Sequence, residues 1–234
     1  MKPLLVLAAF PMVLMGWASC SHSGTGHAAL PDPRAVDKSV PEYKNPFHPS
    51  TYAHFVARKD YRKTYDVYKD DTLLNRQPKK SRKIFVCLDE QRGQYLVDGL
   101  VAMDFPLSSG VKAYPTKTGD YAVISKKEDH TSNLYGKMYD AEGKCINYNA
   151  ESTDPIPEGG RFDGSPMPYW QRLTNAGLGL HVGRVRRHPV SHGCVRLPRN
   201  VAEILYRQTS IGTPVTIQKT PLPVPEAQKI PPAQ

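Results

Sequence analysis

The segment GLHVGRVRRHPVSHGCVRLP, residues 179–198, decides how the rest of the chain is interpreted. It places Cys194 close in sequence to two histidines, His181 and His192. A thiol needs a base to become a nucleophile near neutral pH, because the unperturbed pKa of cysteine is about 8.5. An imidazole within hydrogen-bonding distance can supply that base. The segment therefore predicts a nucleophilic cysteine.

The neighbours of this cysteine leave three interpretations open. Gly193 allows a tight backbone turn, so the amides of Gly193 and Cys194 are expected to point at a developing oxyanion. Zinc binding by His181, His192, Cys194 and His188 is an alternative, although structural zinc sites usually show paired ligands at short spacing. A thiol that is merely buried beside two histidines is another. Glycine and proline turns around the segment favour an exposed, reactive side chain.

The block His181, Ser191-His192-Gly193-Cys194 and Arg196 resembles the signature of the L,D-transpeptidases with a YkuD-type catalytic domain. That signature has an upstream His, then Ser/Thr-His-Gly-Cys, then Arg or Asn two residues later. Two features depart from the family pattern: Lys117 stands where proline is common, and only nine residues separate His181 from Ser191. The resemblance covers roughly residues 83–219 and includes further segments: 105–110, 115–119, 167–170 and 212–215.

The resemblance implies a mainly β, YkuD-type sandwich or barrel-like domain that acts on peptidoglycan stem peptides. Cys194 would attack the carbonyl of the third stem residue, expel the terminal D-alanine and hold a thioester. An amine of a second stem peptide would then give a 3→3 cross-link. His181 is the expected base, held by a backbone carbonyl near Val182. No cofactor and no metal are expected.

The resemblance also assigns roles to the other residues of the site. His192 is grouped with the catalytic residues and shapes the site. The remaining candidates bind the substrate or the oxyanion: Ser191, Gly193, Arg196 and Tyr169. Two alternatives to transpeptidation stay open, namely an L,D-carboxypeptidase that uses water and a non-catalytic wall-binding lipoprotein that keeps the fold.

The N-terminus has the features of an export signal. Lys2 precedes the uncharged, largely apolar run 3–18, which is too short for a membrane-spanning helix but suits a secretory signal. Residues 1–19 are therefore assigned to a signal peptide. The run ends Trp17-Ala18-Ser19-Cys20, which resembles a bacterial lipobox except for Trp17. We expect lipidation of Cys20 and a periplasmic, membrane-anchored protein in the cell envelope; cleavage at a nearby bond is the alternative.

The charge balance agrees with an envelope location. The chain has a formal net charge of +9, and residues 1–19 contain one lysine and no acidic residue, so the exported protein stays basic. Because no DNA-binding or RNA-binding motif is found, an anionic envelope is a better partner than a nucleic acid.

The chain of 234 residues has room for one ordinary domain plus appendages. Residues 20–82 are expected to form a lipid-anchored, Pro-rich tether and an N-terminal arm. In this arm Tyr61, Tyr65, Tyr68 and Thr72 fall at helical spacing, which fits a short amphipathic helix docked by its tyrosine face; an extended arm is the alternative. Residues 83–219 are the expected catalytic domain, and residues 220–234 are an expected disordered, Pro-rich tail.

Within the catalytic domain, the sequence predicts strands at 84–88, 94–97, 100–105, 121–125, 177–182 and 213–218. Asp98-Gly99 is a strong hairpin signal. One helix should follow the catalytic cysteine, with Asn200 as N-cap and Gly212 just past its end. Residues 126–170 are expected to be a long lid-like loop or a wall of a cleft. Cys87 is expected to be buried, and its pairing with Cys145 stays open.

Overall fold

Strands dominate the computed structural model, which describes residues 29–76 and 81–230. The mainly β class is therefore confirmed. The predicted signal peptide and Cys20 lie outside the described residues. No helix in the described ranges is both long enough and apolar enough to cross a membrane.

The largest sheet has six strands in the order β1-β4-β3-β2-β13-β5. Asp98 and Gly99 join two of them and have φ values of 51° and 79°. Positive φ at both positions is what a type I′ turn needs, so the predicted hairpin forms at this dipeptide. The strands of this sheet are β1 (Tyr68–Lys69), β2 (Arg82–Cys87), β3 (Arg92–Val97), β4 (Leu100–Pro106), β5 (Gly119–Ala122) and β13 (Pro214–Gln218).

A second sheet carries strands from residues 179–198, which hold the expected nucleophile and are called the catalytic segment below, and it has the order β12-β11-β10-β6. Strands β11 and β12 run parallel, with His181 directly opposite Arg196. The main core lies between the two sheets, where Ile84 of the first sheet and Leu180 of the second are both buried. The strands of the second sheet are β6 (Ser125–Lys127), β10 (Trp170–Arg172), β11 (Gly179–Val182) and β12 (Val195–Leu197).

Helix α3 (Arg199–Gln208) follows β12 and packs Val201 and Leu205 into the core. The expectation that Asn200 caps this helix is wrong, because Pro198 occupies the N-cap and Arg199 is already helical. The fixed φ of proline suits it to the start of a helix, and the N-cap lies two residues earlier than expected. Gly212 lies in the turn after the helix, at φ 91°.

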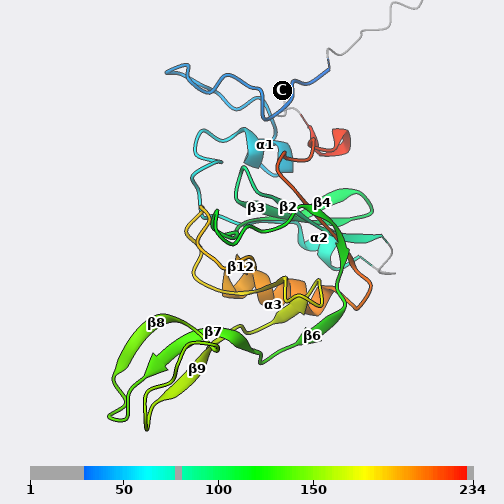
Figure 1. Ribbon diagram of the computed structural model, residues 1–234. Coiled ribbons are helices and arrows are strands. Elements are labelled where there is room, and N and C mark those ends of the chain that lie inside the picture. Colours follow the sequence, from blue (N-terminus) through cyan, green and yellow to red (C-terminus); the bar gives the residue numbers. More distant parts are fainter. Residues whose placement is uncertain (1–28, 77–80, 231–234) are drawn as a thin grey trace, which may run out of the picture.

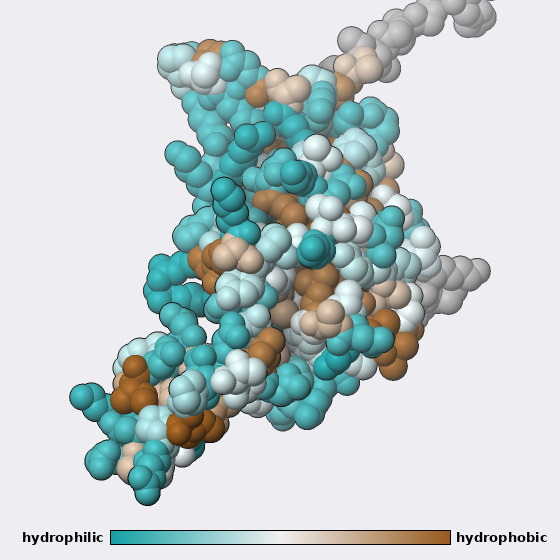
Figure 2. Space-filling model, in the orientation of Figure 1, coloured by the Kyte–Doolittle hydropathy of each residue, from teal (hydrophilic) through white to brown (hydrophobic). Residues whose placement is uncertain are grey.

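The sequence predicts one long loop over residues 126–170. The structure instead has a third sheet there, with the order β8-β7-β9. It consists of β7 (Thr131–Tyr139), β8 (Cys145–Glu151) and β9 (Arg161–Pro166). We call residues 131–166 the projecting sheet, because Figure 1 shows it extending away from the body at the end opposite α1. Ile146 and Ile156 are half exposed here, and Figure 2 shows apolar patches on this part of the surface.

The N-terminal arm packs on the large sheet. It holds α1 (Tyr52–Ala57) and α2 (Asp71–Leu74). Phe47, Tyr52 and Val56 are buried in a second core cluster together with Val101 of β4. From residue 29 onward the predicted tether is therefore part of the folded body. The predicted helix with a tyrosine face is wrong too, since Tyr61 lies outside any helix and Tyr65 is 57% exposed.

The C-terminal segment also packs. A 3₁₀-helix, η1 (Glu226–Gln228), follows the last strand. The Gln228 side chain accepts a hydrogen bond from the Val101 amide (2.8 Å) and donates one to the Val101 carbonyl (3.0 Å). Residues 220–230 are therefore not the expected disordered tail, and the last four residues lie outside the described part.

A buried ion pair joins the arm to the sheet. Arg92 donates to Asp104, and both side chains are completely buried. Arg92 also donates to the carbonyl of Thr64 in the arm (3.2 Å). Asp104 accepts three further hydrogen bonds, from Tyr52 Oη (2.6 Å), Tyr61 Oη (2.9 Å) and Gln94 Nε2 (2.9 Å). Because both oxygens of this carboxylate accept hydrogen bonds, the pair is stabilised where an isolated charge would be very costly.

The three cysteines in the described residues are all free. Cys87 is buried in β2, as expected, and its thiol donates to the Lys219 carbonyl (3.0 Å). Burial raises the pKa of this thiol to about 11, so Cys87 is unreactive near neutral pH. Cys145 begins β8 of the projecting sheet and forms no disulfide with Cys87.

Candidate active site

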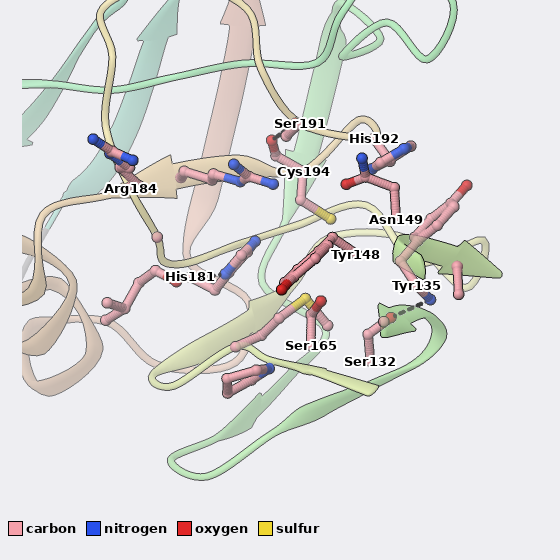
Figure 3. Close-up of a pocket in the computed structure, with 17 residues that line it drawn as sticks. Ser132, Tyr135, Tyr148, Asn149, Ser165, His181, Arg184, Ser191, His192 and Cys194 are labelled. Atoms are coloured by element: carbon pink, nitrogen blue, oxygen red, sulfur yellow. Dashed lines mark hydrogen bonds between the residues drawn. The ribbon is translucent and has the colours of Figure 1, made fainter. Parts of the chain in front are cut away.

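Cys194 lies where two cavities meet. The first has a volume of about 290 Å³ and the second about 360 Å³. Figure 3 shows the first cavity, with the Cys194 thiol reaching into it between the catalytic segment and the projecting sheet. Five residues line both cavities: Ser132, Tyr135, Met167, His192 and Cys194.

The backbone turn at Cys194 depends on glycine and on hydroxyl groups. Gly193 has φ 110°, a conformation that favours glycine over other residues. Ser191 Oγ donates to the Cys194 carbonyl (2.5 Å) and accepts from the Gly193 amide (3.2 Å). Thr116 Oγ1 donates to the Gly193 carbonyl (2.6 Å). The Gly193 amide is therefore engaged within the turn and does not point at an oxyanion, contrary to the sequence-based expectation.

The Cys194 thiol is in its protonated form at neutral pH. Burial raises its pKa, and this effect outweighs the opposing influence of the Gly179 amide and of Arg196. The thiol donates a hydrogen bond to the Gly177 carbonyl (3.2 Å), which a thiolate could not do. A base must therefore remove the proton when the sulfur attacks.

His181 lines the first cavity from β11 and is 6% exposed. Its Nδ1 lies 2.8 Å from the Val182 carbonyl, the backbone contact that the resemblance implied. A carbonyl can only accept, so Nδ1 carries the proton and Nε2 is left unprotonated. Burial lowers the pKa of this imidazole to about 4. His181 is therefore neutral at physiological pH and has a free acceptor nitrogen.

His192 packs in a cluster with two tyrosines, Tyr114 and Tyr135, that the sequence analysis did not identify. The Tyr135 ring stacks on it, with centroids 4.4 Å apart and an interplanar angle of 17°. The Tyr114 ring also packs against His192, with centroids 4.8 Å apart and an interplanar angle of 58°. Burial lowers the pKa of the His192 imidazole. No local sequence signal connects these three rings, because they come from segments far apart in the chain.

The other predicted substrate-binding residues divide into two groups. Ser191 and Arg196 line the first cavity. The Arg196 side chain lies against Gly183, where an added Cβ would come within 2.7 Å of Arg196 Cγ. Tyr169, expected in the donor pocket, is not among the residues that line either cavity, and its ring packs against Tyr206, with centroids 5.6 Å apart.

The projecting sheet forms one wall of the first cavity. Tyr148, Asn149 and Ser165 come from its strands and face the catalytic segment in Figure 3. The prediction that residues 126–170 build a wall of the cleft therefore agrees with the geometry. On the other side of Cys194, Trp170 lines the second cavity and lies 5.9 Å from His181, measured between ring centroids.

The zinc interpretation lacks a ligand set. His188 is exposed, and its Nδ1 lies near the carbonyl of its own neighbour, Pro189 (3.3 Å). Across residues 29–76 and 81–230, no three His, Cys, Asp or Glu side chains are grouped closely enough to hold a metal ion.

Comparison with known proteins identifies the domain that holds this site. The model of the L,D-transpeptidase catalytic domain, YkuD, matches residues 81–217. "Probable L,D-transpeptidase 3" of Mycobacterium tuberculosis (strain ATCC 25618 / H37Rv) is 31% identical over 121 residues, which is 49% of this chain and 38% of that protein. The chain thus spans well under half the length of this relative.

Two solved structures are also similar. The L,D-transpeptidase from Stackebrandtia nassauensis is 22% identical, with a TM-score of 0.45 over 72% of this chain and 67% of that chain. The catalytic domain of the E. faecium L,D-transpeptidase is 27% identical, with a TM-score of 0.43 over 61% of this chain and 100% of that chain. Because the family model covers more than half of the sequence, including Cys194 and both histidines, the chain belongs to the L,D-transpeptidase family.

Proposed function

We propose that this protein is an active cysteine acyltransferase that joins peptidoglycan stem peptides. The observation that carries the proposal is the position of Cys194 at the junction of two cavities, with His181 lining the first. A transpeptidase must hold two substrates against one sulfur, the acyl donor and the acceptor amine. Two cavities that share Cys194 provide that arrangement, whereas a hydrolase needs space for only one peptide and a water molecule.

In the first half-reaction, the Cys194 sulfur attacks the carbonyl carbon of the third stem residue. The thiol proton passes to Nε2 of His181, and a carbon–sulfur bond forms. The tetrahedral intermediate then breaks its carbon–nitrogen bond. The terminal D-alanine leaves as an amine after it takes up the proton from His181, and a thioester on Cys194 remains.

In the second half-reaction, the amine of another stem peptide attacks the thioester carbonyl. His181 removes the proton of this amine and returns it to the departing sulfur, which regenerates the thiol. The product is a 3→3 cross-link. The Cys194 amide is the remaining candidate donor to the oxyanion, since the Gly193 amide is bound by Ser191.

The resting state of the pair is neutral thiol and neutral imidazole. Burial raises the pKa of Cys194 and lowers that of His181, so both shifts oppose a preformed thiolate–imidazolium pair. The sulfur must also give up its hydrogen bond to the Gly177 carbonyl before it can transfer the proton. We therefore assign proton transfer to the moment of attack on bound substrate. This arrangement also limits reaction of the thiol with other electrophiles.

The proposal is tested by mass spectrometry of the products from a purified stem tetrapeptide, with and without an acceptor amine. We expect loss of D-alanine, a thioester on Cys194 and, with acceptor, a cross-linked dimer. Release of D-alanine without dimer in the presence of acceptor would support the carboxypeptidase. Peptide binding without turnover, unchanged after the thiol is blocked, would support the non-catalytic alternative. Cys194→Ala should be inactive, and Cys145→Ala is the matched control because Cys145 is a free thiol outside both cavity linings.

We further propose that the protein works in the cell envelope, exported by residues 1–19 and anchored to a membrane by a lipidated Cys20. The support is the apolar leader and the lipobox-like Trp17-Ala18-Ser19-Cys20. Peptidoglycan is an extracytoplasmic polymer, so the proposed reaction requires this location.

A further inference from the structure

Two arginines lie together at one end of the first cavity. Arg196 comes from β12, and Arg184 comes from the loop that follows β11. Figure 3 shows Arg184 and His181 at one end of this cavity and Tyr135 and Asn149 at the other. Arg184 lies outside the family signature and was not among the residues predicted from the sequence.

Neither guanidinium has a protein partner. Within residues 29–76 and 81–230, the side chains of Arg184 and Arg196 make no hydrogen bond and no ion pair. No aspartate or glutamate is among the residues that line this cavity. By contrast, Arg92 is matched by Asp104 and Arg34 by Glu90. The cavity therefore has a local positive charge with nothing in the described chain to balance it.

Burial makes this charge unfavourable in the empty cavity. Arg196 is half-buried, and desolvation lowers the pKa of its guanidinium. A bound anion would offset that cost, because a guanidinium can give two parallel hydrogen bonds to a carboxylate. Gly183 directly precedes Arg184 and lies against Arg196, and a side chain at this position would collide with the Arg196 side chain. The glycine at position 183 thus leaves room for the Arg196 side chain beside the first cavity.

We propose that Arg184, together with Arg196, binds a carboxylate of the acyl donor in the first cavity. This inference rests on the proposed function, because the stem peptide is the source of the carboxylate. The terminal carboxylate of the donor lies one residue from the carbonyl that Cys194 attacks, a distance of about 4 Å along the chain. Arg196 is close enough to Cys194 to lower the pKa of the thiol, so the site lies beside the reacting sulfur. An acidic residue elsewhere in the stem is a second source of the same group.

The test measures peptide binding to Cys194→Ala protein, in which no thioester can form. Three synthetic tetrapeptides are compared: the free acid, the peptide amidated at its C-terminus, and the peptide amidated at its internal carboxylates. We expect one of the amides to bind about tenfold more weakly than the free acid, which identifies the carboxylate that is recognised. Adding Arg184→Gln should weaken binding of the free acid by a similar factor and abolish the difference between acid and amide.

Arg186→Gln is the matched control. Arg186 is an exposed arginine of the same loop that lines neither cavity, so this variant removes the same charge without touching the site. It should keep the preference for the free acid. If the Arg184→Gln variant also keeps the preference, or if the parent protein has none, the carboxylate site is overturned. Turnover of the same peptides by protein that retains Cys194 is measured separately, so a failure of acyl transfer is distinguished from a failure of this site.

Discussion

The Tyr135 ring lies almost parallel to the His192 imidazole, with the two centroids 4.4 Å apart. Tyr135 belongs to β7 of the projecting sheet, whereas His192 is two residues from Cys194. The stack is therefore a direct contact between the wall of the cavities and the catalytic turn. Tyr114 contacts both rings, with its centroid 4.8 Å from that of His192 and 6.1 Å from that of Tyr135, so the three rings form one cluster.

Removing this contact should lower activity without unfolding the protein. Tyr135→Ala should reduce kcat/KM by up to about tenfold, since such aromatic pairs contribute about 0.5–1.5 kcal/mol. Tyr135→Phe keeps the ring and should retain most activity. The matched control is Tyr139→Ala on the same strand, because Tyr139 packs on Arg161 and lines neither cavity. Equal losses in Tyr135→Ala and Tyr135→Phe would show that the hydroxyl, not the stack, matters.

Replacing His181 by Gln should slow acylation by about 10²-fold or more, the usual contribution of a general base. The imidazole must be unprotonated to act, and its pKa is lowered to about 4. The wild-type rate should therefore hold as pH falls from 7 to 5 and decline only near pH 4. The measurement is kcat/KM as a function of pH. A decline centred near pH 6.5 would contradict the assignment.

The two histidines should differ in their effect on the thiol. We expect His181→Gln to slow alkylation of Cys194 at neutral pH, because the sulfur loses its base. His192→Gln should lower turnover but leave more of the alkylation rate, since the His192 ring packs against Tyr114 and Tyr135. Alkylation rates measured against pH in both variants check this. If the midpoint shifts upward in His192→Gln and stays fixed in His181→Gln, the two roles are reversed.

Asp104→Asn should destabilise the fold by about 3–5 kcal/mol, because it leaves the buried Arg92 charge unbalanced. The arm should loosen at the same time, since Tyr52 and Tyr61 both donate to this carboxylate. Denaturant unfolding measures the free-energy change. Asp98→Asn removes a largely exposed pair with Arg76 and should cost less than about 1 kcal/mol.

Lipidation of Cys20 should raise the intact mass by a diacylglyceryl group and keep the protein in the membrane fraction. Cys20→Ser should abolish both effects. Membrane fractionation and intact-mass measurement check this expectation. Recovery of the wild-type chain as a soluble species cut at another bond would rule out the anchor.

The parts of the fold that depend on local chemistry could be predicted from the sequence. The Asp98-Gly99 turn fixes the register of its two strands, and the residues around Cys194 are contiguous enough to identify a family. Helix α3 begins two residues before the position that the capping preference of Asn200 predicts, because Pro198 restricts the backbone at the helix entry. Even here, the element itself was predicted correctly.

The remaining errors concern contacts between distant segments. The sequence predicts a loop at the projecting sheet, because the strands of this sheet show no regular apolar alternation. These strands are largely exposed, and in β8 only Ala150 is fully buried. The aromatic cluster around His192 needs Tyr114 and Tyr135, which no local pattern connects. The proline content of the arm predicts a tether. Phe47 and Tyr52 are nevertheless buried, because they pack in one cluster with Val101 of β4 and Val224 of the C-terminal segment, which are far away in the sequence.

The packing of the N-terminal arm limits how far the candidate active site could lie from the membrane anchor that we propose at Cys20. An unfolded segment from Cys20 to Arg82 would reach about 200 Å when fully extended. Leu30 already packs against the second core cluster, so the chain from Cys20 to Leu30 can span no more than about 35 Å. If the protein is anchored at Cys20, its active site can reach only a short distance from the membrane. Its cross-links would be confined to the layer of peptidoglycan that lies within that span, plus the length of the molecule itself, from the anchoring membrane.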